Sequence, residues 1–454
     1  MTRLQVLFLL ALAAVVACRR AASVFPNAPV ILISVDTLRA DHLPAYGYGG
    51  VETPALDALA RDAIVFENAI SQVPLTLPSH ASLFTGLLPF QNGVRDNVGY
   101  RLGKEKATLA SFLRGRGYAT GGAVSAFVLD HATGVASGFD FYEDRIEARQ
   151  SGQAIGEVER PGAETERLLE GWIGSLPPGK PFFAFLHLYE PHAPYSPPQP
   201  FAARYAGHPY DGEIAAADAI TGTFLAFLKS KGLYDRAIVI FLSDHGEGLG
   251  DHGEDEHGIF LYREAIRVPL FVKLPGSRGG RRERRATALV DVFPTIAAAL
   301  GAKAPAGLAG SSLLGAIAGA RRTYSETLYP RLHFGWSDLA SLADGRFHYV
   351  HAPRPELYDW DSDPAERKDL AREMPAPFRT MRVEITAMDR PFTEPGISDP
   401  ETVKKLAALG YISVTSAGSG RNNLPDPKDR IGALTRLKES SRLSSEGHFE
   451  QAAA

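Results

Sequence analysis

Residues 237–258 read AIVIFLSDHGEGLGDHGEDEHG, and this stretch is the strongest indication of the fold. It opens with an apolar run at 237–242, which is typical of a strand buried on both faces of a parallel sheet. The next fifteen residues hold six acidic residues and three histidines. Carboxylates crowded on one loop repel each other unless a cation is bound. Hard cations take oxygen ligands, and zinc and manganese also accept imidazole. The stretch therefore predicts a metal site at the end of a strand, or otherwise a solvated acidic loop.

The same arrangement recurs at two other apolar runs. Polar groups follow three such runs: Asp36 after 30–35, the 187–192 segment after 182–188, and Asp244-His245 after 237–242. Binding sites in open α/β sheets lie outside the carboxyl ends of the strands, so these groups are expected to meet at one edge. Taken singly, each also has a structural explanation, because Asp36 can cap a turn and His187 fits a core histidine.

Strand-like and helix-like segments alternate through most of the chain. Helices are expected at 54–63, 108–116, 164–175, 211–231 and 291–300, and further strands at 119–124 and 268–273. This alternation predicts an α/β fold with a mainly parallel sheet and helices on both faces. Ser79 is expected to cap another helix. Thr76 would then stand just before a helix N-terminus, where backbone N–H groups favour anions.

The composition is that of a soluble globular chain. Of the 454 residues, 45% are hydrophobic and 22% are charged, and the net charge of −4 gives no sign of a nucleic-acid binder. The only cysteine is Cys18, so neither an intrachain disulfide nor a thiolate metal site is available. The basic run SRGGRRERR at 277–285 is interpreted as a solvated loop, with binding of phosphate headgroups as the alternative.

The N-terminus has the pattern of an export signal. Arg3 precedes an apolar run at 4–17, which is too short to span a bilayer comfortably, and Cys18 follows directly. We therefore predict a lipoprotein-type signal peptide over 1–18, cleaved to leave Cys18 as a lipidated N-terminus. The protein would then be exported to the periplasm or cell surface and anchored to the membrane. The alternative is an ordinary signal peptide cut nearby.

Changes of pattern along the chain predict its domain organisation. After the signal peptide we expect a linker at 19–27, a core at 28–330, a small C-terminal subdomain at 331–391, a linker at 392–428 and a helical tail at 429–454. The last residues, EGHFEQAAA at 446–454, resemble the middle of a tetratricopeptide repeat. A single repeat cannot bury its own face. Either the natural chain continues beyond Ala454 or this segment docks elsewhere, which leaves room for a protein partner.

Several motifs together carry a family resemblance. In chain order they are VDTLRADHLPAYGY (35–48), PSHASLFTG (78–86), SDHGEGLGDHGEDEHGIFLYREAIRVP (243–269) and ELYDWDSDP (356–364). With these motifs, residues 28–370 resemble the sulfatase family of the alkaline-phosphatase-like superfamily. The resemblance implies an alkaline-phosphatase-like α/β core and an enzyme that hydrolyses or transfers ester groups.

The resemblance also implies one divalent metal ion, held by Asp36, Asp244, His245 and the nucleophile. Calcium, magnesium, manganese and zinc all remain open as its identity. In the family a second aspartate often follows the first, whereas this chain has Thr37. In this respect the chain is similar to phosphonate monoesterases, which have a three-ligand site.

The nucleophile position departs from the family pattern. Sulfatases carry Cys or Ser at the start of a C/S-x-P-S-R motif and oxidise it to formylglycine, whereas the matching string here is TLPSH, from Thr76 to His80. Threonine is a secondary alcohol and cannot give an aldehyde. We therefore expect no formylglycine and a plain Thr76 alkoxide, as the resemblance to alkaline phosphatases and phosphoethanolamine transferases implies.

Four further residues are implied to act on the substrate. His192 matches a family histidine near the transferred group, and Asn97 matches a substrate-contacting asparagine of the phosphonate-monoester-hydrolase branch. His80 stands where sulfatases have arginine and is expected to bind substrate with Asn97. His257 stands where that branch has lysine. We expect His192 or His257 to protonate the leaving oxygen, a task suited to a side chain that titrates near neutrality.

Together these inferences predict a metal-dependent hydrolase or transferase of phosphate, phosphonate or sulfate esters that forms a covalent Thr76 ester. The substrate would be a small molecule or a lipid or glycan ester. Phosphorus is favoured, because a sulfate ester of threonine would hydrolyse slowly without formylglycine. Two alternatives remain: an arylsulfatase-like sulfuric ester hydrolase, and a non-catalytic, lipid-anchored binding module with a tetratricopeptide-like tail.

Overall fold

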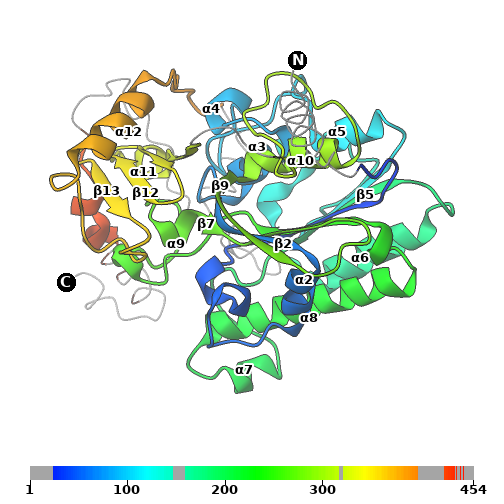
Figure 1. Cartoon of the computed structure of the whole chain (residues 1–454). Coiled ribbons are helices and arrows are strands. Elements are labelled where there is room, and N and C mark those ends of the chain that lie inside the picture. Colours follow the sequence, from blue (N-terminus) through cyan, green and yellow to red (C-terminus); the bar gives the residue numbers. More distant parts are fainter. Residues whose placement is uncertain are drawn as a thin grey trace, which may run out of the picture.

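The computed structural model describes residues 24–146, 159–315, 321–396 and 424–434, together with residues 436, 440 and 443 (Figure 1). The expected signal peptide with Cys18 and the tetratricopeptide-like residues 446–454 lie outside these residues, so both remain predictions. Within the part of the chain that is described, no helix is both long and apolar enough to cross a membrane.

Among the described residues, nine strands form the central sheet of the larger part (Figure 1). In spatial order they are β4 (Phe141–Glu143), β3 (Ala119–Ala123), β5 (Phe182–Leu188), β1 (Val30–Val35), β6 (Ile238–Ser243), β8 (Leu270–Lys273), β2 (Ile64–Ile70) and β7 (Arg267–Val268), and β9 (Arg281–Ala288) pairs with β2. Neighbours are parallel from β4 to β6, whereas β8 is antiparallel to β6 and to β2. The chain leaves β6 and enters β8 at the same end of the sheet, which makes these two strands antiparallel.

The strand register brings the candidate residues to one edge. β1 lies between β5 and β6, and Val35 is aligned with Leu188 on one side and with Ser243 on the other. Asp36 and Asp244 each follow their strand directly. They therefore leave the sheet side by side at its carboxyl edge.

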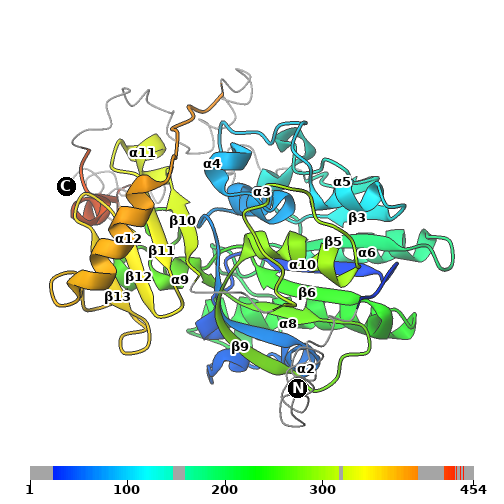
Figure 2. The ribbon, with the colours of Figure 1, turned by 45° about the horizontal axis from the view of Figure 1, so that its top comes forward.

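Helices cover both faces of the sheet (Figure 2). On one face lie α3 (Thr76–Thr85), α5 (Leu109–Arg114) and α10 (Val292–Ala299), and on the other α2 (Pro54–Asp62), α6 (Gly162–Ser175) and α8 (Pro209–Ser230). Successive strand residues serve the two layers, since Leu32 packs on the α3 side and Ile33 on the α8 side. The connections hold the short helices α4 (Pro89–Asn92), α7 (Phe201–Arg204) and α9 (Arg263–Ile266).

A second, antiparallel sheet lies beside the first (Figure 1). It consists of β10 (Thr323–Thr327), β11 (Leu339–Ala343), β12 (Phe347–His351) and β13 (Glu356–Asp359), and it is accompanied by α11 (Tyr329–Phe334) and α12 (Pro375–Ala387). This sheet begins at residue 323, ahead of the subdomain boundary expected at 331. The proposed division into domains stays a prediction.

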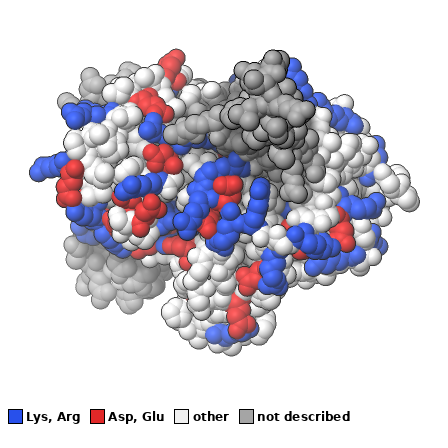
Figure 3. All heavy atoms as spheres, in the orientation of Figure 1, with Lys and Arg blue, Asp and Glu red and all other residues white. Residues whose placement is uncertain are grey.

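The basic run at 277–285 differs from its interpretation as a loop. Residues 281–288 form β9, which pairs in parallel with β2. Arg282 and Arg284 both form ion pairs with Glu67 of β2. Basic and acidic side chains are interspersed on the face of the molecule shown in Figure 3. The second part of the run, residues 281–285, therefore belongs to a strand whose charges are partly balanced by its neighbour, whereas residues 277–280 are not part of a strand.

Candidate active site

Helix α3 begins at Thr76 itself. The sequence-based expectation was wrong here, because Ser79 lies inside the helix and its hydroxyl donates to the Asp244 carbonyl oxygen at 2.8 Å. Asn97 acts as the cap instead, since its Oδ1 accepts from the Leu77 backbone N–H at 2.9 Å. Thr76 thus lies in the first turn of the helix, where the helix dipole favours negative charge.

Four side chains meet at the carboxyl edge of the sheet. The Thr76 hydroxyl donates to Asp36 Oδ2 at 3.2 Å and lies 3.4 Å from His245 Nε2. His245 Nε2 lies 3.4 Å from Asp36 Oδ1 and 3.5 Å from Asp244 Oδ2. Thr76 is 2% exposed and the other three are fully buried. The residues that the resemblance implies as metal ligands thus form one buried cluster.

This cluster fits a divalent cation. One donor atom each from Asp36, Asp244 and His245 lie within 4.8 Å of one another. His245 Nδ1 donates to the Gly246 carbonyl oxygen at 3.0 Å, so Nε2 is the nitrogen that can bind a metal. Burial lowers the pKa of His245 to about 4, which keeps the ring neutral. Burial raises the pKa of the Asp36 carboxyl group and raises that of Asp244 to about 7. Asp244 Oδ2 has no hydrogen-bond partner among the described residues. Paired buried carboxylates and a neutral imidazole are ligands that a divalent cation takes.

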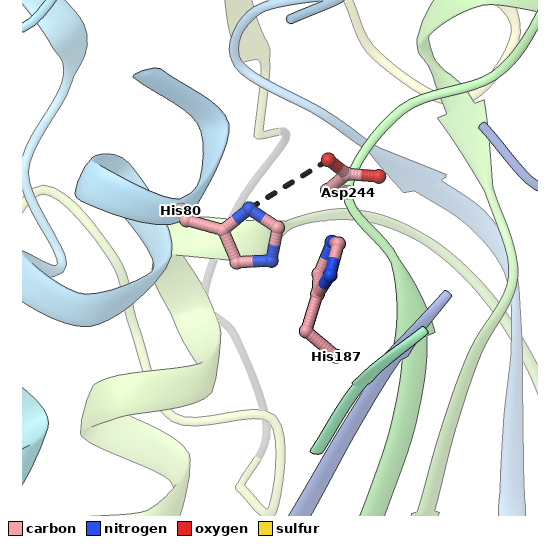
Figure 4. Close-up of side chains that lie close together, drawn as sticks. All are labelled: His80, His187 and Asp244. Atoms are coloured by element: carbon pink, nitrogen blue, oxygen red, sulfur yellow. Dashed lines mark ion pairs between the residues drawn. The ribbon is translucent and has the colours of Figure 1, made fainter. Parts of the chain in front are cut away.

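His80 lies beside Asp244, with its Nδ1 3.6 Å from Asp244 Oδ2 (Figure 4). Its Nδ1 donates to the Thr76 carbonyl oxygen at 2.8 Å, and its Nε2 accepts from the Ser34 hydroxyl at 3.0 Å. Burial lowers the pKa of His80 to about 4, so the ring is neutral with its one proton on Nδ1. His80 is fully buried and both ring nitrogens are engaged, so it supports the first turn of α3, and the expected contact with substrate stays a prediction.

His187, on β5, lies beside both His80 and Asp244 (Figure 4), with its ring centre 5.1 Å from that of His80. Its Nε2 lies 3.5 Å from Asp36 Oδ2. The side chain is fully buried, and neither ring nitrogen has a hydrogen-bond partner in the described part of the chain. It therefore differs from the satisfied core histidine that its place in an apolar run suggests.

His257 is held by a buried glutamate. Its Nδ1 lies 2.9 Å from Glu247 Oε1, and Glu247 Oε2 accepts from the Tyr195 hydroxyl at 3.0 Å. Glu247 is fully buried, and burial raises its pKa to about 7. The His257 ring centre is 4.4 Å from that of His245. Glu247 thus orients the His257 ring beside His245.

His192 lies next to His257, with ring centres 5.1 Å apart. Its Nδ1 donates to the Ala193 carbonyl oxygen at 2.6 Å, and its ring stacks on Tyr189 with centres 4.3 Å apart. Burial lowers the pKa of His192, which favours the neutral ring. Both histidines proposed as proton donors therefore border the cluster.

The second sheet contributes to the neighbourhood of Asn97. His333, on α11, donates through Nε2 to Asp96 at 3.1 Å. Sequence reasoning missed this contact and also the contacts of Glu247 and Tyr195, and for His187 it offered a place at this edge or a core position. Glu247 alone carried a local signal, because it follows His245 by two residues in the acidic loop. The others are brought in by strand pairing and by the packing of distant elements.

Comparison with known protein sequences gives related proteins over most of the chain. The sequence model of the family described as "Sulfatase" matches residues 28–302. The arylsulfatase of Clostridium perfringens (strain 13 / Type A) is 25% identical over 438 residues, covering 76% of this chain and 90% of that protein. The multifunctional alkaline phosphatase superfamily protein PehA of Trinickia caryophylli is 27% identical over 476 residues, covering 75% of this chain and 91% of that protein.

The fold has counterparts among solved structures. The phosphonate monoester hydrolase of Agrobacterium radiobacter matches with a TM-score of 0.68 at 24% identity, covering 79% of this chain and 95% of that chain. This likeness confirms the predicted α/β architecture, with a central sheet that is mixed and mostly parallel and has helices on both faces.

Proposed function

Because the chain belongs to the sulfatase family, we propose that it is a metal-dependent hydrolase of phosphate or phosphonate esters with Thr76 as its nucleophile. The family consists of metal-dependent ester hydrolases of the alkaline phosphatase superfamily. One observation carries the proposal. The Thr76 hydroxyl lies in the first turn of α3, 3.2 Å from Asp36 and 3.4 Å from His245.

The choice of phosphorus over sulfur follows from the threonine. A secondary alcohol cannot become formylglycine, so no second hydroxyl on the same carbon is available to expel sulfate. A threonine phosphoester can instead be opened by attack of water at phosphorus. The neighbouring side chains then have to orient the nucleophile and move protons.

In the first step Thr76 acts as an alkoxide after its proton has left to solvent. When bound at Asp36, Asp244 and His245, a divalent cation would supply Lewis-acid chemistry that lowers the pKa of the hydroxyl. The bond from Thr76 Oγ1 to phosphorus forms as the bond to the leaving oxygen breaks. That oxygen takes a proton from His257 Nε2, while Glu247 holds His257 Nδ1 at 2.9 Å.

In the second step the covalent ester is opened. Water attacks phosphorus, the bond to Thr76 Oγ1 breaks, and His257, now neutral, takes the proton of the water. His192, whose ring centre is 5.1 Å from that of His257, is the alternative group for these proton transfers. An acceptor alcohol in place of water would make the enzyme a transferase.

Hydrolysis of sulfate esters is the second candidate. The observation in its favour is the similarity to the arylsulfatase of Clostridium perfringens over 76% of this chain. This reaction would need Thr76 sulfate to be released without formylglycine, which is the reason we place it second. A binding module without turnover remains the alternative of another class.

A hydrolysis panel with metal-loaded protein tests the proposal. The substrates are nitrophenyl phosphate, bis-nitrophenyl phosphate, a phenylphosphonate ester and nitrophenyl sulfate. We expect turnover of phosphorus esters that falls about 10³-fold or more in Thr76→Ala, because the covalent route is lost. Thr85→Ala, at the other end of α3, is the matched control and should retain activity.

Each other result argues against part of the proposal. Full activity of Thr76→Ala would remove Thr76 as nucleophile. Faster, Thr76-dependent turnover of the sulfate than of any phosphorus ester would favour the second candidate. Turnover of none of the esters by protein with bound metal would favour the binding module.

A further inference from the structure

His187 is a buried imidazole with no hydrogen bond, placed between two carboxylates. It is the second-to-last residue of β5, and it is paired with Ser34 in the register between β5 and β1. Neither ring nitrogen has a hydrogen-bond partner among the described residues, although the side chain is fully buried. Leaving a buried polar group unpaired costs about 1–3 kcal/mol, so such a group needs an explanation.

The ring lies beside two of the proposed ligands, Asp36 and Asp244. His187 Nε2 lies 3.5 Å from Asp36 Oδ2, and His187 and Asp244 have donor atoms within 4.8 Å of each other (Figure 4). Asp244 Oδ2 is itself without a hydrogen-bond partner in the described structure. Two neighbouring buried side chains thus each have polar atoms without a hydrogen-bond partner in the described structure, and a shared cation would satisfy both.

His80, the other imidazole of this group, is already engaged. His80, His187 and Asp244 together have donor atoms within 4.8 Å of one another. However, His80 Nδ1 carries a proton that it donates to the Thr76 carbonyl oxygen at 2.8 Å. A separate ion in this group would therefore have only two protein ligands, whereas an ion shared with the neighbouring cluster has more.

We propose that His187 is a further ligand of the cation held by Asp36, Asp244 and His245. The proposal rests on the metal centre of the proposed function and adds a second imidazole to it. The resulting set has two carboxylates and two neutral imidazoles, with the Thr76 hydroxyl beside them. Imidazole nitrogen suits zinc, manganese and cobalt, whereas calcium and magnesium take oxygen. The centre should therefore prefer a transition metal.

Metal binding tests this without any turnover. Protein stripped with a chelator is loaded with Co²⁺ or Zn²⁺, the bound metal is counted, and X-ray absorption of the wild-type protein gives the number of imidazole ligands. We expect one ion per chain with two imidazoles. We also expect Ca²⁺ and Mg²⁺ to bind more weakly than Co²⁺.

The variant His187→Phe keeps a ring in the core and removes both nitrogens. We expect it to bind Co²⁺ more than about tenfold more weakly. Even the loss of a residue that only hydrogen-bonds to a metal ligand lowers metal affinity by about 10–100-fold. The Co²⁺ absorption spectrum should also change. The metal-free variant should melt no lower than the metal-free wild type, because an unpaired polar group has been removed. His208→Phe, at an exposed position, is the control and should match the wild type.

Three results would overturn the proposal. One is a single imidazole ligand in the wild type. Another is unchanged Co²⁺ affinity and spectrum in a folded His187→Phe. The third is two ions per chain, which would assign His187 to a separate ion. If His187→Phe fails to fold, the ligand count on the wild type still decides. Loss of turnover in the panel above, with these metal results intact, would contradict the proposed function alone.

Discussion

Position 76 sets which chemistry this chain can carry out. Its threonine keeps a simple hydroxyl, so activation and orientation must come from the surrounding residues. His80 fixes the Thr76 carbonyl at 2.8 Å, and Asn97 fixes the next backbone N–H at 2.9 Å. The first turn of α3 is therefore held on both sides. The Thr76 hydroxyl is thus oriented by its own backbone as well as by the side chains that it contacts.

Glu254, in the same loop as His257, gives the protein a pH-dependent stability. Its carboxyl group is buried and accepts from the backbone N–H groups of Ile259 at 2.7 Å and Phe260 at 3.0 Å. Burial raises its pKa from 4.5 to about 8. The folded protein thus holds a proton that the unfolded chain has lost. This contribution to stability is full below pH 4.5 and disappears as the pH rises through about 8.

We expect Glu254→Gln to remove this dependence, because the amide keeps an acceptor and does not ionise. Urea denaturation between about pH 6 and about pH 9 should show the wild type losing on the order of 1–3 kcal/mol relative to the variant. Glu105→Gln, at an exposed site, should follow the wild-type profile. A Glu254→Gln profile that declines in parallel with the wild type would contradict the assignment.

At the scale of elements, a buried ion pair fixes the loop of Asn97 to the second sheet. Arg95 is 4% exposed and donates to both carboxylate oxygens of Glu326 on β10, at 2.6 and 2.8 Å. Its remaining nitrogen donates to the Pro391 carbonyl oxygen at 2.7 Å. A bidentate pair in this position has a defined geometry. It links the cap of α3 to an element far away in the sequence.

Arg95→Met should therefore be strongly destabilising. It leaves Glu326 buried and charged, with only the Tyr324 hydroxyl at 2.6 Å, and should lower the free energy of unfolding by about 3–5 kcal/mol. Arg95→Met combined with Glu326→Leu should cost less than the two single changes added, because no buried charge remains. Urea denaturation of the three variants gives the comparison. Simple additivity would show that the two side chains act independently.

The elements that could be predicted are those with an apolar signal of their own. β1 and β5 have the expected bounds, because their apolar runs match buried strands. β9 was missed because its outward arginines hide the strand pattern. α3 starts earlier than expected, because Pro78 is tolerated in its first turn. Backbone N–H groups in the first turn have no partner within the helix, so the missing N–H of proline costs nothing there. Sequence runs thus give strands, while charged edges and helix starts depend on neighbours.

The candidate site shows the same division. Asp36 and Asp244-His245 could be foreseen because each follows an apolar strand, and parallel strands end at one edge. The 187–192 segment was expected at the same edge, but the contact of the His187 side chain itself with Asp36 follows only from the pairing of β5 with β1. The sequence of an apolar strand does not show which side chains of other strands will lie next to its single polar residue. Such residues are found only when the strand order is known.

At the scale of the whole molecule, the acidic loop is held between the two sheets. When protonated, His252 donates from Nδ1 to Glu264 at 2.6 Å and from Nε2 to the Glu366 carbonyl oxygen at 3.1 Å. Burial lowers the pKa of His252, but the contacts with Glu264 and Glu366 outweigh this effect and raise the pKa. Thr327 of β10 donates to the Gly258 carbonyl oxygen. The loop that carries His257 is therefore positioned from the C-terminal part of the chain as well as from β6.

The tail adds a third support for this loop. Residues 431–434 are helical, and Ile431 and Leu434 pack with Tyr329 and Phe334 around a cavity of about 50 Å³ that His257 also lines. Ile431→Asp would bring a charge into this apolar contact and should lower the free energy of unfolding by about 1–3 kcal/mol. It should also lower kcat several-fold, because the position of His257 becomes less defined.

The control for the tail is Arg430→Asp, which introduces the same carboxylate one residue earlier at an exposed position. We expect it to retain both stability and kcat. Thermal denaturation and turnover of the two variants, measured side by side, separate the effect of the apolar contact from that of the added charge. If Ile431→Asp behaved like its control, the tail would rest on the loop without supporting it. The two sheets alone would then hold His257 in place.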